Sequence, residues 1–322
     1  MGRTGVIVAQ LGGPAHLDQV EPFIKSIFAD PDLVPLPGGR RTRSVFSALV
    51  ARLRAPRVRA RYDAIGGGSP IIETTRQQAD ALADELGARG HDVIVAVAHR
   101  HSFPDTEAAV DAVLAAGGDR LLLLPLFPQY SRATTGSSES ELRRVVAARG
   151  SDVPLRVVRS WCDHPSYLDL QARLVDEMLD TVPVEQSDGG LVVYSAHGLP
   201  ERTVERGDPY VEEVEATVAD VTGRLQRPVE HQIAFQSRTG PIKWVGPDVR
   251  EVIQAAATDG RPWVGVVPIS FVSEHLETLH ELDIELAGLA HEVGLGDFVR
   301  SRCPDVRPEV GPVLADIVEE YL

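Results

Sequence analysis

Short apolar runs alternate with longer amphipathic stretches along the whole chain. The runs at 5–11, 93–98 and 121–127 are mostly apolar, as expected of parallel strands buried on both faces. Further strands are predicted near 155–160, 190–196, 230–235 and 263–271. Stretches with apolar residues every three or four positions predict helices near 16–29, 74–87, 105–116, 165–181, 208–225, 247–258, 275–293 and 312–321.

This repeated strand–helix order with short loops predicts parallel sheets that helices cover on both faces. Both halves show the same order, so we expect two α/β domains, each a doubly wound, Rossmann-like parallel sheet, at 1–152 and 153–322. Whether the last helix packs back on the first domain is left open. The carboxyl ends of the two sheets are expected to line a cleft between the domains, where folds of this kind bind ligands.

The composition narrows the class of protein. Of the 322 residues, 43% are hydrophobic and 25% are charged, as in soluble globular proteins. The formal net charge of −15 argues against a nucleic-acid-binding protein. Cys162 and Cys303 are the only cysteines, too few for a disulfide framework or a four-cysteine metal site, and they favour the reducing cytosol. No apolar run approaches the ~20 residues of a membrane span, so we expect a cytoplasmic protein.

Residues 40–61, here called the basic segment, differ from the rest of the chain. They contain eight arginines and no acidic residue, together with an apolar stripe; the stripe is Val45, Phe46, Leu49, Val50 and Leu53. One interpretation is an amphipathic helix that meets anionic lipid at the inner face of a membrane, or the carboxylates of a substrate. The other is a surface helix whose arginines extend into solvent.

Residues 271–285, here called the acidic segment, follow a predicted strand and carry glutamates three or four positions apart; these are Glu274, Glu277, Glu281 and Glu285. We expect one helix with the carboxylates along one side. A solvated acidic face is the alternative. The position after a strand and the presence of His275 favour a site for a cation or a proton. The pattern is not that of a zinc protease, because Leu276 stands where His-Glu-x-x-His has Glu.

Other polar residues stand at predicted strand ends. His197 ends the run 191–196 and precedes Gly198, which favours a functional histidine over a buried structural one. Arg100 follows the strand 93–98. Ser138 and Glu141 have the spacing of a capping box, which favours a helix cap over an anion site there.

Six motifs in this order resemble those of ferrochelatases, which insert ferrous iron into a porphyrin. They are Leu11–Pro14, Ile65–Pro70, Pro128–Ser131 with Thr134–Ser137, Ser195–Pro200, Gln236–Pro241 with Trp244, and Glu274–Glu285. Each motif alone is modest, but together they cover nearly the whole chain. The resemblance implies that His197 and Glu277 face one another across the porphyrin plane and ligate the incoming metal, with His275 and Glu281 supporting them.

The resemblance also implies residues that hold the ring and its propionates. These are Leu11, Ser69, Arg100, Tyr130, Ser137, Ser237 and Trp244. It leaves open whether His197 or Glu277 accepts the pyrrole protons. Histidines flank Arg100 where many members have Tyr or Lys, and Glu274 stands where many have Asp.

The resemblance implies Fe²⁺ as a substrate and no permanently bound cofactor. The [2Fe–2S] cluster of some relatives needs four cysteines, so none is expected. Gln10–Pro14 and the basic segment look more like enzymes for protoporphyrin IX than those for coproporphyrin III. The alternatives are a chelatase for coproporphyrin III or another tetrapyrrole, and a non-catalytic porphyrin or haem carrier. A nucleotide-binding protein is disfavoured because no phosphate-binding fingerprint is present.

Overall fold

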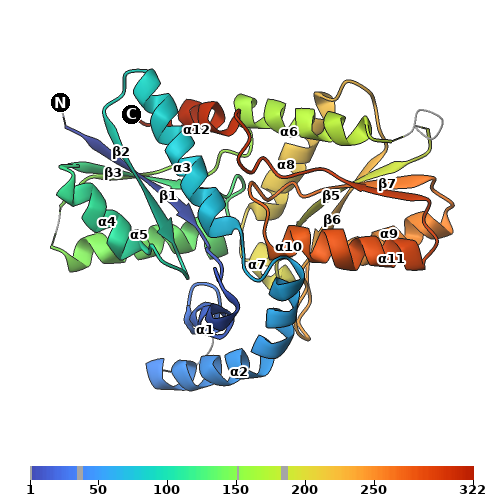
Figure 1. The fold of residues 1–322 in the computed structure, drawn as a ribbon, viewed down its shortest axis with the longest axis horizontal. Helices are drawn as coiled ribbons and strands as arrows, with labels where there is room; N and C mark the ends of the chain where they lie inside the picture. Colours follow the sequence, from blue (N-terminus) through green and yellow to red (C-terminus); the bar gives the residue numbers. More distant parts are fainter. Residues whose placement is uncertain (1, 35–38, 151, 183–187) are drawn as a thin grey trace. The chain divides into compact units, whose positions relative to one another are not determined.

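The computed structural model describes the chain except residues 1, 35–38, 151 and 183–187. The chain forms two compact units, each built around its own sheet (Figure 1). Unit one comprises 1–127, 131–159 and 308–322, and unit two comprises 128–130 and 160–307. The domain boundary at 152/153 and the cleft between domains stay predictions.

Unit one holds a four-stranded parallel sheet in the order β2-β1-β3-β4. Its strands are β1 (Thr4–Gln10), β2 (Val93–His99), β3 (Arg120–Pro125) and β4 (Leu155–Val157). Its helices are η1 (Leu17–Gln19), α1 (Val20–Ala29), α2 (Arg40–Ala64), α3 (Ile71–Ala88), α4 (Thr106–Ala115), η2 (Arg132–Gly136), α5 (Ser137–Ala148) and α12 (Val310–Glu319).

The sheet of unit one is buried on both faces, which explains the unbroken apolar runs. Ile7, Leu121 and Leu123 point to one face and pack against α4 and α5. Their neighbours Val6 and Leu122 point to the other face and are just as fully buried. The last helix, α12, packs against α3 within this unit.

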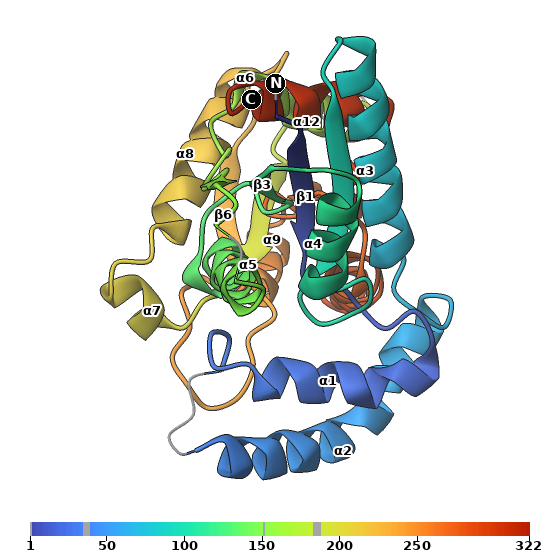
Figure 2. The same cartoon turned by 90° about the vertical axis from the view of Figure 1, so that its left-hand side faces the viewer.

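The basic segment forms most of α2, which lies alongside α1 in both views (Figure 2). Its apolar stripe is exposed: Val45, Leu49 and Leu53 show 71%, 57% and 72% of their surface. These residues are four apart, so they share one side of the helix. The structure therefore has the predicted amphipathic helix, with Val45, Leu49 and Leu53 exposed, while the Phe46 ring lies 6.5 Å from that of Phe28.

Unit two holds a second four-stranded parallel sheet, in the order β6-β5-β7-β8. Its strands are β5 (Leu191–His197), β6 (His231–Gln236), β7 (Trp263–Val267) and β8 (Asp297–Arg300). Its helices are α6 (Pro165–Leu179), α7 (Glu201–Glu205), α8 (Tyr210–Gly223), α9 (Val249–Thr258), α10 (Leu276–Leu279), η4 (Glu281–Leu286) and α11 (Ala287–Glu292).

Both faces of the second sheet are also covered. Val193 and Val266 pack against α9, η4 and α11, with Leu282 and Leu286 in the same core cluster. On the other face α6 comes close at Gly265, where a Cβ would lie 2.7 Å from the Met178 side chain. The two parallel sheets confirm the predicted α/β fold class.

The acidic segment is not the single helix that was predicted. Strand β7 ends at Val267, and the chain stays irregular up to His275 before α10 begins. A π-helical stretch, η4, then interrupts the helix, because the His280 carbonyl accepts from both Ile284 N (3.2 Å) and Glu285 N (2.9 Å). Glu274 therefore precedes the helix, and the four glutamates do not form one row.

Two further features differ from what the sequence predicted. The predicted capping box fails, because the Ser138 hydroxyl donates to the Thr134 carbonyl. Instead Ser131 caps the π-helical turn η2 that precedes α5, accepting from Ala133 N. Strand β8 was not predicted at all; it is only four residues long and partly exposed, so its apolar signal is weak.

Acidification should destabilise the fold partly through His99, which is fully buried at the end of β2. Burial lowers the pKa of His99 from 6.5 to about 4, so the folded state keeps the ring neutral while the unfolded chain binds a proton. The neutral ring costs the folded state nothing above pH 6.5, the pKa in the unfolded chain. As pH falls from 6.5 towards 4, the free energy of unfolding decreases, by roughly 2 kcal/mol at about pH 5. Denaturant unfolding at about pH 7.5 and at about pH 5 measures this difference in the free energy of unfolding.

Replacing His99 by Gln should remove this part of the acid sensitivity. The matched control is His16→Gln, which changes an exposed histidine and should leave the loss as in the wild type. Equal losses for the wild type and His99→Gln would contradict the prediction.

Candidate active site

His197 is placed by the strand that precedes it. Strand β5 is buried up to Ala196, and its last residue, His197, has 40% of its side chain exposed. The His197 amide donates to Ser270 Oγ (3.2 Å), and the Gly198 amide donates to the Gln236 carbonyl (2.9 Å). The two backbone amides that flank the Cα of His197 are thereby hydrogen-bonded to neighbouring segments.

Glu277 meets His197 directly. Its Oε2 lies 2.7 Å from His197 Nδ1, although the two residues are 80 positions apart. The structure thus brings together the two residues on which the predicted site depends. The expectation that they face one another across a porphyrin differs from this arrangement, because no ring fits between atoms in direct hydrogen-bond contact.

The end of β6 supplies two further polar side chains to the same place. Ser237 Oγ lies 3.0 Å from Glu277 Oε2 and 2.6 Å from Glu281 Oε2. The side-chain amide of Gln236 donates through Nε2 to the Glu277 carbonyl (2.8 Å), and its Oε1 accepts from the Ser195 hydroxyl (2.7 Å). Ser237 has a φ of 65°, the left-handed region that non-glycine residues rarely adopt.

Ser237 was predicted to contact substrate, but in the structure its hydroxyl links two carboxylates. A hydroxyl can donate only one hydrogen, so it donates to one glutamate and can accept from the other when that one is protonated. Gln236 was not predicted to act at the site. Its place directly before Ser237 at the end of a buried strand was the available signal.

His275 stands beside this cluster as the cap of α10. Its amide donates to Thr278 Oγ1 (3.0 Å), its Nδ1 lies 3.0 Å from the Ser273 carbonyl, and its ring packs on Phe271 (4.7 Å between centroids). Burial lowers the pKa of His275, so the ring favours the neutral form.

The His197–Glu277 pair is electrostatically coupled. Burial disfavours an imidazolium at His197, but the carboxylates of Glu277 and Glu281 outweigh it and raise the pKa of His197. Burial likewise disfavours a carboxylate at Glu277, but His197 outweighs it and lowers the pKa of Glu277. Without substrate the pair therefore favours an imidazolium next to a carboxylate.

The remaining predicted residues fall into separate groups. In unit one, Arg100 Nε donates to Ser137 Oγ (3.0 Å), and Arg100 Nη2 forms an ion pair with Asp30 (2.8 Å). The Ser69 amide donates to the Pro14 carbonyl, and the Leu11 amide donates to Gln10 Oε1.

In unit two, the Tyr130 amide donates to Glu213, and Trp244 forms an antiparallel β-bridge with Pro200. Trp244 lies close to the end of β5, because a Cβ at Gly198 would be 3.6 Å from its ring. Within the described residues, no group of three or more His, Cys, Asp or Glu side chains is arranged to hold a metal ion.

Comparison with known proteins identifies the family. A family model described as Ferrochelatase matches residues 3–322. The chain belongs to the ferrochelatase family. A ferrochelatase of Synechococcus sp. (strain JA-3-3Ab) is 43% identical over 325 residues, covering 100% of this chain and 94% of the relative. A ferrochelatase of Geobacter metallireducens is 40% identical over 319 residues, covering 99% of this chain and 98% of the relative.

A solved structure supports the fold independently. SirB from Bacillus subtilis with Fe³⁺ aligns with a TM-score of 0.59 at 13% identity, over 99% of this chain and 95% of that one. Membership of the ferrochelatase family makes the protein a metal chelatase that inserts iron into a porphyrin, as the motifs predicted. Iron is thus a substrate of this chelatase.

Gly198→Ala should damage the site locally. A Cβ at Gly198 would lie 2.8 Å from the Gln236 carbonyl oxygen, so either β5 or the end of β6 must shift. We expect a loss of about 1–3 kcal/mol in the free energy of unfolding and a large loss of iron insertion. Gly288→Ala is the control, because open space surrounds that helical position. Full activity in Gly198→Ala would contradict the prediction.

Proposed function

We propose that this chelatase inserts Fe²⁺ into protoporphyrin IX to give protohaem, the last step of haem biosynthesis. The observation that carries iron insertion is the His197–Glu277 pair, at 2.7 Å. The choice of protoporphyrin IX rests on Gln10–Pro14 and the basic segment. Insertion requires a base for the two pyrrole protons and a ligand that passes the iron to the ring nitrogens. Imidazole and carboxylate can perform both tasks, and each binds iron only when deprotonated.

The hydrogen bonds around Glu277 support a path for the released protons. Ser237 connects Glu277 to Glu281, so a proton on one carboxyl group can pass to the other through a single hydroxyl. Because His197 favours the charged form in the pair, metal binding to its ring must release a proton. His275, whose pKa is lowered by burial, caps the helix α10 on which Glu277 follows two residues later.

Arg100 is proposed to hold a propionate, as the family motifs imply. In the structure its guanidinium is already occupied by Asp30 at 2.8 Å and Glu141 at 3.7 Å, with Ser137 on Nε. A propionate would therefore share or replace these carboxylates. The proposed ring-holding roles of Leu11, Ser69, Tyr130, Ser137, Ser237 and Trp244 rest on the motifs alone.

The test is a metal-insertion assay with Fe²⁺ and a panel of protoporphyrin IX, coproporphyrin III and sirohydrochlorin. We expect the highest kcat/KM with protoporphyrin IX. His197→Ala should lower kcat about a thousandfold while porphyrin binding, followed by absorbance, persists, because the residues proposed to hold the ring are other ones.

Other outcomes of the panel would change the function assigned. Preference for coproporphyrin III or sirohydrochlorin would identify a different tetrapyrrole chelatase. Binding without insertion of any metal would indicate a non-catalytic porphyrin carrier. Full activity in His197→Ala would overturn the role of the pair.

We further propose that the basic segment meets the anionic inner face of a membrane and that the protein is otherwise cytoplasmic. The described residues include no helix long and apolar enough to cross a bilayer. On α2, however, an exposed apolar stripe runs between exposed arginines such as Arg52 and Arg57. An amphipathic helix of this kind inserts its apolar side and pairs its cations with lipid phosphates.

Liposome sedimentation tests this contact. The protein should bind vesicles that contain anionic phosphatidylglycerol, and added salt should weaken the binding. Replacing Leu49 and Leu53 by Ser should reduce binding about tenfold or more, since each removes buried apolar area. The control is Ile242→Ser, which removes an exposed apolar residue outside α2. Salt-independent or absent binding would refute the membrane contact.

A further inference from the structure

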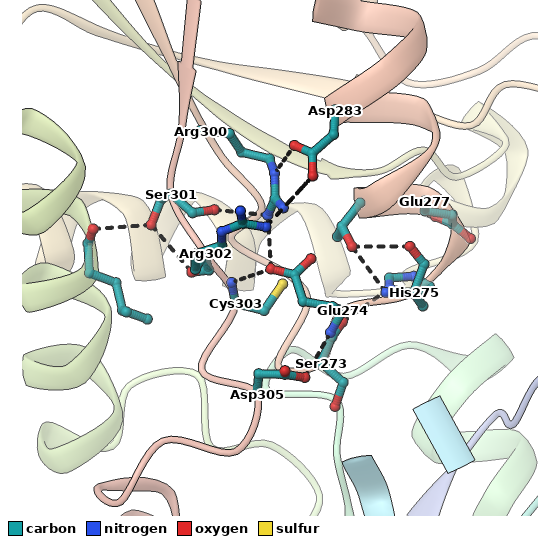
Figure 3. A network of polar contacts seen from close by, with 12 residues as sticks. Ser273, Glu274, His275, Glu277, Asp283, Arg300, Ser301, Arg302, Cys303 and Asp305 are labelled. Carbon is teal, nitrogen blue, oxygen red and sulfur yellow. Dashed lines mark hydrogen bonds and ion pairs between the residues drawn. The ribbon is translucent and has the colours of Figure 1, made fainter. Parts of the chain in front are cut away.

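A buried arginine lies behind the acidic segment, away from the His197–Glu277 contact. Arg300 is the last residue of β8, and its side chain is only 4% exposed. Figure 3 shows its guanidinium between the carboxylates of Asp283 and Glu274. These three side chains, here called the Arg300 network, have no part in the function proposed above.

One arm of the network fixes the residue before His275. Glu274 Oε1 accepts from Arg300 Nη1 (3.0 Å) and from the Cys303 amide (3.1 Å). The Glu274 amide donates to Asp305 Oδ1 (3.2 Å). Both the side chain and the backbone of Glu274 are thus tied to the stretch that follows β8. The carboxylate turns toward Arg300 and does not extend the row of Glu277 and Glu281.

The other arm fixes the π-helical stretch. Asp283 lies inside η4 and receives a two-point contact from Arg300, from Nε to Oδ1 and from Nη2 to Oδ2 (2.7 Å). On the other side of the same stretch, Leu282 and Leu286 are buried in the core. The π-helical turn is therefore held from two sides, by apolar packing and by an arginine fork.

The energetics make this network more than a surface ion pair. Burial opposes a charged Glu274, but Arg300 outweighs it and lowers the pKa of Glu274. Burial likewise opposes the charged form of Arg300, and its carboxylate partners outweigh it, so its pKa is raised. Removing Arg300 would leave the buried Glu274 carboxylate without its cation, and Lys cannot reproduce the planar fork of the guanidinium.

The two carboxylates that Arg300 binds lie at the two ends of one stretch of chain. Glu274 and Asp283 flank the residues that carry His275, Glu277 and Glu281. One guanidinium thus joins both ends of the stretch that presents these side chains to His197, without touching the pair itself. We propose that Arg300 is a positioning residue, which with Asp283 holds residues 274–283 so that Glu277 meets His197. This inference rests on the proposed function for its kinetic consequences.

The main test is Asp283→Asn, because Asp283 is one-third exposed and its loss leaves Arg300 paired with Glu274. We expect kcat for iron insertion to fall about 10–100-fold, as for other residues that orient a ligand through a hydrogen bond. KM for the porphyrin should stay within about twofold, because no ring contact is changed. Arg300→Lys should give a similar loss, since charge without the fork does not hold Asp283 at two points.

A double-mutant cycle separates positioning from general structural damage. If Arg300 and Asp283 act through Glu277, then Asp283→Asn should add little to the loss already caused by Glu277→Gln. Hydrogen exchange of the wild type and Asp283→Asn should differ most at the amides of 274–286. The matched control is Glu177→Gln, which breaks an exposed ion pair with Arg307 in the same unit and should change neither readout.

The outcomes are distinct. A low kcat with unchanged KM, non-additive with Glu277→Gln and with faster exchange confined to 274–286, supports the proposal. An unchanged kcat in folded Asp283→Asn and Arg300→Lys, or additive losses in the cycle, overturns it. If the wild type inserts no iron at all, the proposed function fails, while the exchange experiment still decides whether the Arg300 network holds the segment.

Discussion

The site depends on one hydrogen bond between an imidazole and a carboxylate that separate parts of the chain deliver. His197 arrives at the end of β5, and Glu277 arrives on the short helix α10 after β7. Strands β5 and β7 are direct neighbours in the sheet, with Tyr194 opposite Val267. Because parallel strands end at the same edge of a sheet, the two chain segments emerge side by side. The sheet thus determines which residues can meet.

A charged pair that is partly withdrawn from water needs further polar partners, and the surroundings of Glu277 supply them. Its carboxylate accepts a hydrogen bond from the Ser237 hydroxyl, and its backbone carbonyl accepts one from the Gln236 side-chain amide. Two unusual backbone features lie near the pair: Ser237 has a positive φ, and η4 is π-helical. Such features cost free energy and persist where surrounding contacts enforce them. Their closeness to the pair indicates that the geometry of the pair is what they maintain.

The sequence predicted the parts of the structure that depend on local patterns. Buried parallel strands read as apolar runs, so β1, β2, β3 and β5 were located, and the motifs named both members of the pair. The π-helical turn was not predictable, because it depends on one carbonyl, that of His280, accepting two amides instead of one. The Arg300 network was missed for a related reason. Asp283 and Glu274 precede Arg300 by 17 and 26 positions, and Arg300 itself stands on a strand too short to show an apolar pattern.

The contact between His197 and Glu277 also constrains how a porphyrin enters. A flat ring in van der Waals contact with a group on each face needs roughly 7 Å between those groups, since carbon contacts are about 3.5–4 Å. The two side chains are 2.7 Å apart, so a porphyrin that lies between them, as the family motifs imply, must break their hydrogen bond. The backbone of Glu277 is tied to Gln236 and lies between the two anchors of the Arg300 network. The side chains can rotate at lower cost than the segment can move. Opening therefore releases His197 from its carboxylate, which removes the main cause of its raised pKa and favours the neutral ring when the substrate arrives.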